Sequence, residues 1–204
     1  KKMRDLLMAE EDSGRYLLSI LSTFAKENPP KLEEALSLIR SSAPQPAVHK
    51  NVLLSDTVQN AIKYLAFLAD YQLIFDTACG MYDFEMAKAV ARHSQLDPKI
   101  YLPMLKRWKE LPQFIAKYEV DVKLKRYESA LRNLVACYRE ETNTPQTLIS
   151  PARPAVGFSQ CLEFIETHKL HRLGLELFKR DDPEGHRSIM LSLGEQLLAD
   201  RKPD

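Results

Sequence analysis

The chain has 204 residues, of which 45% are hydrophobic and 28% charged, and its formal net charge is +1 at pH 7. This length suffices for one large domain or two small ones with a continuous core. The near-balanced charge gives no reason to expect a nucleic-acid-binding or membrane protein as a whole. With only 6 glycines, the sequence also offers little of the hairpin chemistry that an all-β fold needs.

The cysteines and the opening residues indicate where the protein resides. Three scattered cysteines, Cys79, Cys137 and Cys161, form no even-numbered disulfide framework, which suits a reducing compartment. No apolar run approaches the roughly 18 residues of a membrane span. The first residues, KKMRDLLMAEEDSG, lack the apolar centre of a signal peptide and an initiator methionine. We therefore expect a soluble cytoplasmic, or also nuclear, segment of a longer protein that does not associate with membranes.

Apolar residues recur at spacings of three and four along most of the chain, which predicts amphipathic helices. In chain order the clearest sets are Leu32, Leu36 and Ile39; Val58, Ile62, Leu65 and Ala69; Leu124, Tyr127, Leu131 and Leu134; and Ile189, Leu193 and Leu197. The pattern indicates roughly ten helices of about 10 to 20 residues, joined mostly by short connections.

Three stretches carry helix-start signals. ENPPKLEEAL, LDPKIYL and DDPEGHRSI each place Asn or Asp just before Pro. Such a side chain can accept from free backbone N–H groups, and proline at the first helical position loses no hydrogen bond. We therefore predict helix starts at 28–29, 97–98 and 182–183.

The second proline of the LDPKIYLP stretch, Pro103, lies where a helix interior should disfavour it. A proline there costs about 3 kcal/mol in an unadapted helix. Because Pro103 follows Pro98 by only five residues, we expect a kink or a late helix start. Orientation of Tyr101 and Leu102 into a neighbouring repeat is the favoured consequence, and a carbonyl freed for a partner is the alternative.

Two stretches rich in Pro, Ser and Thr, 41–51 and 141–157, are predicted to be loops or partly disordered linkers. Elsewhere the sequence echoes itself: 80–94 aligns with 123–137, and a fainter copy occupies 168–180. In the first two copies an aromatic residue, Phe84 or Tyr127, precedes an alanine by three. Spacings in the forties predict an irregular, tetratricopeptide-like stack of helix pairs. The expected fold is therefore an all-α α-solenoid, with 1–204 as a single solenoid segment.

A search for catalytic chemistry gives little. The sequence has no phosphate-binding glycine loop, no H-E-x-x-H and no C-x-x-C. Cys161, His168 and His171 resemble a metal set, but on one helix the first two would lie about 10 Å apart, beyond the reach of a single zinc ion. We therefore predict a protein that is not an enzyme, with no catalytic residue, cofactor or metal.

The strip from Lys99 to Arg126 is strongly basic, with eight basic and three acidic residues. Beside Trp108, Tyr118 and Tyr127, these cations could contact RNA through phosphate charge and ring stacking. A solvated helix surface whose rings belong to the core is the favoured interpretation. An acidic protein partner is a further alternative.

One stretch is specific enough to suggest a family. The segment 64–108, with GMYDFEMA followed by SQLDPKIYLP, and then RYESALRNL at 126–134, closely resembles the helical region of the large scaffold subunit of the Elongator complex, the IKAP family. HKLHRLGLELF and SLGEQLL extend the resemblance toward the C-terminal end.

This resemblance implies a non-catalytic scaffold segment of a complex that modifies the wobble uridine of transfer RNA. The implied partners are other Elongator subunits, namely the radical-SAM, acetyltransferase-like catalytic subunit and a propeller subunit. The resemblance also implies a parent that is a homodimer through a region outside this chain. Direct binding of transfer RNA through 99–126 is the alternative function.

Two groups of residues follow as candidate sites. Tyr101, Pro103, Arg107 and Trp108 are predicted to form an exposed patch that binds a protein partner. Lys123, Lys125 and Arg126 are the candidate RNA contacts.

Overall fold

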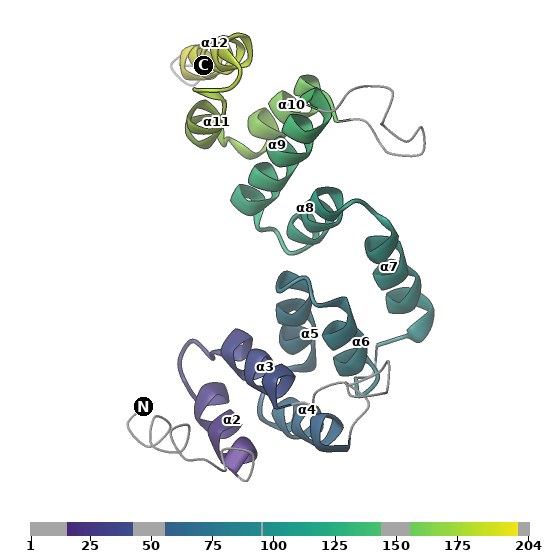
Figure 1. Cartoon of the computed structure of the whole chain (residues 1–204). Coiled ribbons are helices and arrows are strands. Elements are labelled where there is room, and N and C mark those ends of the chain that lie inside the picture. The colour runs from purple at the N-terminus through teal and green to yellow at the C-terminus, as the bar shows by residue number, and fades with distance from the viewer. Residues whose placement is uncertain (1–15, 43–55, 95, 144–155, 200–204) are drawn as a thin grey trace. The chain divides into compact units, whose positions relative to one another are not determined.

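A computed structural model describes residues 16–42, 56–94, 96–143 and 156–199 (Figure 1). Within these ranges the regular structure is helical, without a strand, so the predicted all-α class is confirmed. The helices are α2 (Leu17–Ala25), α3 (Leu32–Ser41), α4 (Asp56–Leu68), α5 (Tyr71–Gly80), α6 (Phe84–Ala91), α7 (Pro98–Glu110), α8 (Gln113–Lys123), α9 (Tyr127–Asn143), α10 (Phe158–His168), α11 (His171–Phe178) and α12 (Pro183–Ala199). The chain divides into two compact units, residues 1–109 and 110–204.

In the first unit, α3 packs on α2, α4 and α5, while α4 packs on α2 and α6. The residues that meet between these helices are the apolar ones whose three-and-four spacing predicts amphipathic helices. Leu36, Ile39, Ile62 and Leu65 are all fully buried. Burying an aliphatic side chain of this size contributes about 1.5–3 kcal/mol. The core of this unit therefore follows directly from the periodicity.

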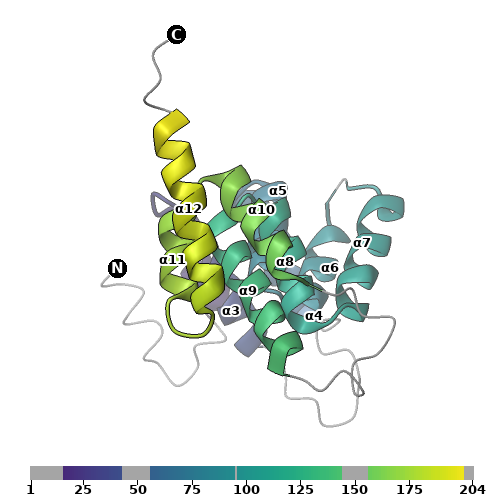
Figure 2. The ribbon, with the colours of Figure 1, turned by 90° about the horizontal axis from the view of Figure 1, so that it is seen from above.

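In the second unit, α9 packs on α8, α10 and α11, and α12 lies along α10 and α11 (Figure 2). A buried carboxylate joins α8 to α9: Asp121 of α8 accepts hydrogen bonds from Ser129 (2.6 Å) and Asn133 (2.8 Å) of α9. The apolar core collects side chains from every helix of the unit, among them Ile115, Leu131, Val135, Ile165, Phe178 and Ile189. Stacking of helix pairs on their neighbours is the arrangement of an α-solenoid, as predicted.

The same turn joins three of the helix pairs, α5–α6, α8–α9 and α10–α11. Its central residue adopts the left-handed conformation, with φ of 57° at Tyr82, 57° at Lys125 and 54° at Lys169. The next residue donates its N–H to the carbonyl five positions back, Asp83 to Ala78, Arg126 to Asp121 and Leu170 to Ile165. This is the Schellman ending of a helix. The sequence echo therefore reflects a repeated backbone motif, including its fainter third copy.

A small residue follows each turn at the same distance into the second helix: Ala87, Ala130 and Gly174, all buried. The closeness of the helices is clearest at Gly174, where an added Cβ would lie 2.7 Å from Cδ1 of Ile165 in α10. A larger side chain at these positions would push the two helices apart.

Two of the three predicted helix starts are correct. α7 begins at Pro98, with Asp97 accepting from the N–H of Lys99 at 2.8 Å, and α12 begins at Pro183. Asn28 and Pro29 start no helix, because the N–H of Lys31 donates to the carbonyl of Phe24 at the end of α2 (3.1 Å). This bond folds the connection back, and α3 begins only at Leu32.

Three further expectations need correction. Pro103 causes no late helix start, since α7 runs from Pro98 to Glu110 without interruption. Leu124 and Tyr127 do not share a helix: α8 ends at Lys123 with Leu124 as its C-cap, Lys125 adopts the left-handed conformation, and α9 begins at Tyr127. The predicted loops begin late: Ser41 is still in α3 and α9 continues to Asn143, while 43–51 and 144–155 lie outside the described residues.

Candidate functional site

Helix α7 has one buried face. Tyr101, Leu105 and Trp108 follow one another at spacings of four and three, and they share that face. Tyr101 and Trp108 are only 6% and 4% exposed. The ring of Trp108 packs on Phe84 of α6, with centroids 5.8 Å apart. The predicted exposed patch is therefore wrong for Tyr101 and Trp108, which hold α7 in place.

The opposite face of α7 carries the other two predicted residues. Pro103 and Arg107 are exposed, and so are Ile100 (70%) and Leu102 (40%). Ile100, Pro103 and Arg107 are spaced by three and four, so they share the outer face. Ile100 was missed by the sequence analysis, although the phase of the helix would have shown it. Whether this outer face, Ile100, Leu102, Pro103 and Arg107, binds a partner stays a prediction.

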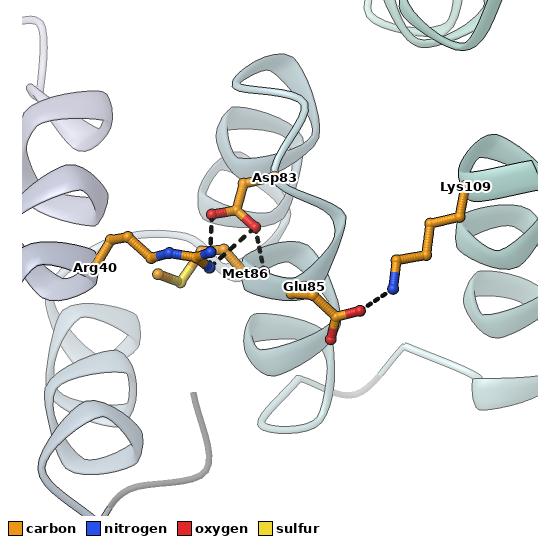
Figure 3. Close-up of polar contacts among 5 residues, drawn as sticks. All are labelled: Arg40, Asp83, Glu85, Met86 and Lys109. Atoms are coloured by element: carbon orange, nitrogen blue, oxygen red, sulfur yellow. Dashed lines mark hydrogen bonds and ion pairs between the residues drawn. The ribbon is translucent and has the colours of Figure 1, made fainter. Parts of the chain in front are cut away.

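Polar contacts link α6 to the helices on either side of it (Figure 3). Asp83, the N-cap of α6, accepts from the N–H of Met86 at 3.0 Å and pairs with Arg40 of α3 at 3.0 Å. Two residues later, Glu85 pairs with Lys109 of α7. The Lys109 hydrogen bond lowers the pKa of Glu85, against the opposing effect of burial. These contacts join α6 to α3 and to α7 through charges that all retain some exposure to solvent.

An open groove of about 440 Å³ lies in the first unit between the α2–α3 connection and α5. Its lining combines apolar and acidic side chains, including Pro29, Pro30, Leu73, Glu27, Glu33 and Glu34. Lys31, also in the lining, pairs with Glu34 at 3.3 Å and with Glu27 at 3.8 Å. The charges of the groove are thus partly balanced by the chain itself.

A second exposed apolar surface belongs to α12. Met190, Leu191, Leu197 and Leu198 are each more than half exposed. They flank Gly194, which has open space where a Cβ would stand. By contrast, Ile189 on the inner face is fully buried. The predicted helical set of Ile189, Leu193 and Leu197 therefore turns only partly toward the core.

The candidate RNA contacts Lys123, Lys125 and Arg126 are all exposed, at the turn between α8 and α9. The basic strip 99–126 crosses the boundary between the two units: Lys99 to Lys109 lie in the first unit, and Lys117 to Arg126 lie in the second. Its rings are not available for base stacking: Trp108 is buried, while Tyr118 and Tyr127 pack edge-on against Phe164 at 5.6 Å and 6.4 Å. The favoured interpretation, in which these rings belong to the packed interior, is confirmed.

The residues of the metal-like set have other contacts. Cys161 is fully buried, which raises its pKa to about 12. His168 stacks on Tyr127, with ring centroids 3.9 Å apart, and His171 lies 3.2 Å from the hydroxyl of Ser192. Across the described ranges, no three His, Cys, Asp or Glu side chains are grouped so that they could hold a metal ion.

No helix in the described part of the chain combines the length and the apolar character needed to cross a membrane.

Repeated helix pairs with packed inner faces and exposed outer faces define a member of the α-solenoid class. Comparison with known proteins shows which one: a family model described as ELP1 alpha-solenoid matches residues 1–108, and the chain belongs to this family. The resemblance to the large Elongator subunit is thereby confirmed.

Three relatives show the extent of the similarity. The chain is 31% identical over 192 residues to the putative elongator complex protein 1 of Xenopus laevis, covering 94% of this chain and 14% of the relative. It is 30% identical to elongator complex protein 1 of Arabidopsis thaliana, covering 91% and 13%. For the protein of that name from Schizosaccharomyces pombe the identity is 31%, covering 92% and 13%. The chain thus spans about one-seventh of the length of these relatives.

Proposed function

We propose that this chain is a non-catalytic scaffold segment of the Elongator complex, the assembly that modifies the wobble uridine of transfer RNA. Its role is to hold other subunits through protein–protein contacts. The partners we propose are the radical-SAM, acetyltransferase-like catalytic subunit and the propeller subunit. Membership of the ELP1 alpha-solenoid family supports this proposal.

The observation that carries the proposal is the division of α7 into two faces. Its inner face is occupied by the chain itself, through Tyr101, Leu105 and Trp108. Its outer face presents Ile100, Leu102 and Pro103 next to Arg107. An apolar centre with an arginine at its edge is the composition typical of protein–protein contact surfaces.

The test is affinity capture from cell extract of the full-length protein, with Ile100→Glu and Leu102→Glu introduced together. Because both side chains are exposed, the fold should tolerate the change, and circular dichroism should be unaltered. We expect the catalytic or the propeller subunit to be lost from the captured material, as quantitative mass spectrometry would show. Arg132→Glu, an exposed change on α9, is the matched control and should retain every subunit.

Two results would overturn the proposal for this surface. Retention of all subunits by the doubly substituted protein would exclude α7 as a docking face. Equal loss with Arg132→Glu would show that added negative charge, rather than the α7 face, disturbs the assembly.

A further inference from the structure

The outer face of α7 changes in chemistry along its length. Its first half is apolar, with Ile100, Leu102 and Pro103 all exposed. Lys106 and Arg107 follow on the same side of the helix and are exposed as well. Pro103 and Arg107 are four residues apart, which is about 6 Å along the axis. An apolar half is thus followed, one helical turn later, by a cationic half.

The charge of α7 is predominantly positive. Between residues 97 and 110 the basic side chains outnumber the acidic ones: they are Lys99, Lys106, Arg107 and Lys109, against Asp97 and Glu110. Lys109 is paired with Glu85 of α6, and Asp97 accepts from the N–H of Lys99 at the start of the helix. The cationic half, Lys106 and Arg107, therefore gives the outer face an electrostatic preference for an acidic partner.

Pro103 adds a backbone acceptor to the outer face. Because a proline has no N–H, the carbonyl of Lys99, four residues earlier, lacks the donor that closes a normal helical turn. Lys99 and Pro103 are both exposed, so this carbonyl lies on the outer side of the helix. α7 nevertheless continues without interruption to Glu110. The helix thus presents a hydrogen-bond acceptor beside its apolar half.

We propose that the outer face of α7 binds an acidic segment of a partner protein. An aliphatic side chain of that segment covers the apolar half, and a carboxylate about 6 Å further along pairs with the cationic half. A backbone N–H or hydroxyl group of the segment donates to the Lys99 carbonyl. This inference rests on the proposed scaffold function and defines the chemistry of the partner that docks on α7.

The apolar half favours a protein over a nucleic acid. Phosphate contacts use cations, and base stacking needs exposed rings. The aromatic side chains of α7 are Tyr101 and Trp108, and both are buried. Protein contact surfaces, by contrast, combine an apolar centre with charged residues at the rim. A basic protein segment is disfavoured, because it would meet Lys106 and Arg107 with like charge.

The experiment compares substitutions of opposite charge at the same two positions of the full-length protein. Ile100→Glu with Leu102→Glu and Ile100→Lys with Leu102→Lys both remove two exposed aliphatic side chains. An acidic segment repels the first pair of substitutions and attracts the second. In affinity capture from cell extract at low salt, we expect the Lys variant to retain roughly tenfold more of the docked catalytic or propeller subunit than the Glu variant does. The difference should shrink as salt is added.

A second pair of variants tests the cationic half. Lys106→Glu with Arg107→Glu should release the same subunit while the apolar half stays intact. The matched control, Lys26→Glu with Lys63→Glu, reverses two exposed lysines elsewhere in the first unit and should retain the subunit.

Pro103→Met tests the carbonyl. Methionine keeps an apolar side chain on the outer face but restores the N–H that bonds to the Lys99 carbonyl. It should weaken retention roughly two- to tenfold, the effect of one hydrogen bond. The unfolding temperature of the full-length protein should not fall, because methionine is the better helix former.

The scaffold function and the acidic partner can fail separately. If neither the Glu nor the Lys variant loses a subunit, α7 is not a docking face and both proposals are wrong. If both variants lose the subunit equally, α7 is a docking face but its partner is not acidic. Full retention by Lys106→Glu with Arg107→Glu, or by Pro103→Met, would also overturn the proposed recognition. So would release of the subunit from the unsubstituted protein by ribonuclease, which would show that RNA makes the contact.

Discussion

Tyr82 and Lys125 occupy the same place in two helix pairs, with an identical φ of 57° and the same hydrogen bonds around them. Neither is a glycine, although the left-handed conformation favours one. The repeat therefore consists of a backbone turn and a small residue, Ala87 or Ala130, placed one helical turn beyond the start of the second helix. Side chains at the turn itself are left free to differ.

The small residue of the second copy gives the first prediction. Ala130 is fully buried in the core that α8 and α9 share, so Ala130→Leu should overpack it at a cost of roughly 1–3 kcal/mol. Denaturant unfolding would measure this loss. Arg132→Leu, on the exposed side of the same helix, should change the unfolding free energy by less than about 0.5 kcal/mol. Equal effects of the two changes would contradict the close approach of the helices at Ala130.

Two helical glycines should respond in opposite directions. Gly194→Ala meets open space and should stabilise the protein by about 0.5–1 kcal/mol, the difference in helix propensity. Gly174→Leu places its Cβ against the buried Ile165, and the remaining atoms of the leucine would have to be accommodated at a buried position. We expect overpacking of roughly 1–3 kcal/mol to outweigh the gain in propensity. Thermal unfolding of both variants would measure the two changes in stability. Stabilisation by Gly174→Leu would show that α10 and α11 separate easily.

How much of the fold and of the candidate site could be predicted from the sequence depended on how far apart in the chain the interacting residues lie. The packed faces of α3 and α4 follow from local periodicity, because the spacing of apolar residues within one helix is enough to place Leu36 or Ile62 on its buried face. The repeated turns could be detected as a sequence repeat for the same reason, since each turn and the small residue after it lie close together in the sequence. The contact between Tyr127 and His168 was not, since no local pattern encodes which helices become neighbours.

The exposed patch on α7 shows a different kind of error. The predicted patch places Tyr101 and Trp108 on the surface, whereas the helical phase that they share with Leu105 places them on the buried face. Pro103 falls on the outer face and is exposed. The predicted helix start at Asn28 is wrong because the N–H of Lys31 donates to the carbonyl of Phe24 across the α2–α3 connection, and α3 begins only at Leu32.

Asp83 combines a helix cap with an ion pair, and the two can be separated. Asp83→Ala should cost about 1 kcal/mol through loss of the cap on Met86, with a small addition from Arg40. Arg40→Ala alone should cost less than about 0.5 kcal/mol, because the Arg40 side chain is about half exposed. Asp70→Ala, which removes the cap of α5 on Gln72 and Leu73, is the control for capping alone. Chemical denaturation would measure the unfolding free energy of each variant. If Arg40→Ala lost as much stability as Asp83→Ala, the ion pair rather than the cap would be the larger contribution.

The cysteines should be inert in the folded protein. All three are buried, and burial, with Cys137 nearby, raises the pKa of Cys161 to about 12. The thiolate is the reactive form, so labelling at pH 8 should be very slow until the chain unfolds. A disulfide reagent such as dithionitrobenzoate should report three thiols in guanidinium and almost none without it. Rapid reaction of the native chain would mean that one of these core regions opens readily.

The last prediction concerns pH. Burial, followed by the positive charges of Lys63 and Arg92, lowers the pKa of His93 below its ordinary value of 6.5, and the ring is hydrogen-bonded to Gln59. Below pH 6.5 the unfolded chain therefore binds a proton that the folded chain resists. The contribution of His93 to stability is present above about pH 6.5 and decreases as the pH falls toward the folded pKa.

The measurement is denaturant unfolding at pH 7.5 and pH 5.5, for the unsubstituted chain and for His93→Gln. Glutamine can still form hydrogen bonds but does not titrate, so the variant should lose less stability between the two pH values. Glu85 should not obscure the comparison, because its pKa is lowered from 4.5 and its contribution is lost only at still lower pH. If both proteins lose the same stability, His93 does not resist protonation, and Lys63, Arg92 and burial have too little effect on its ring to matter.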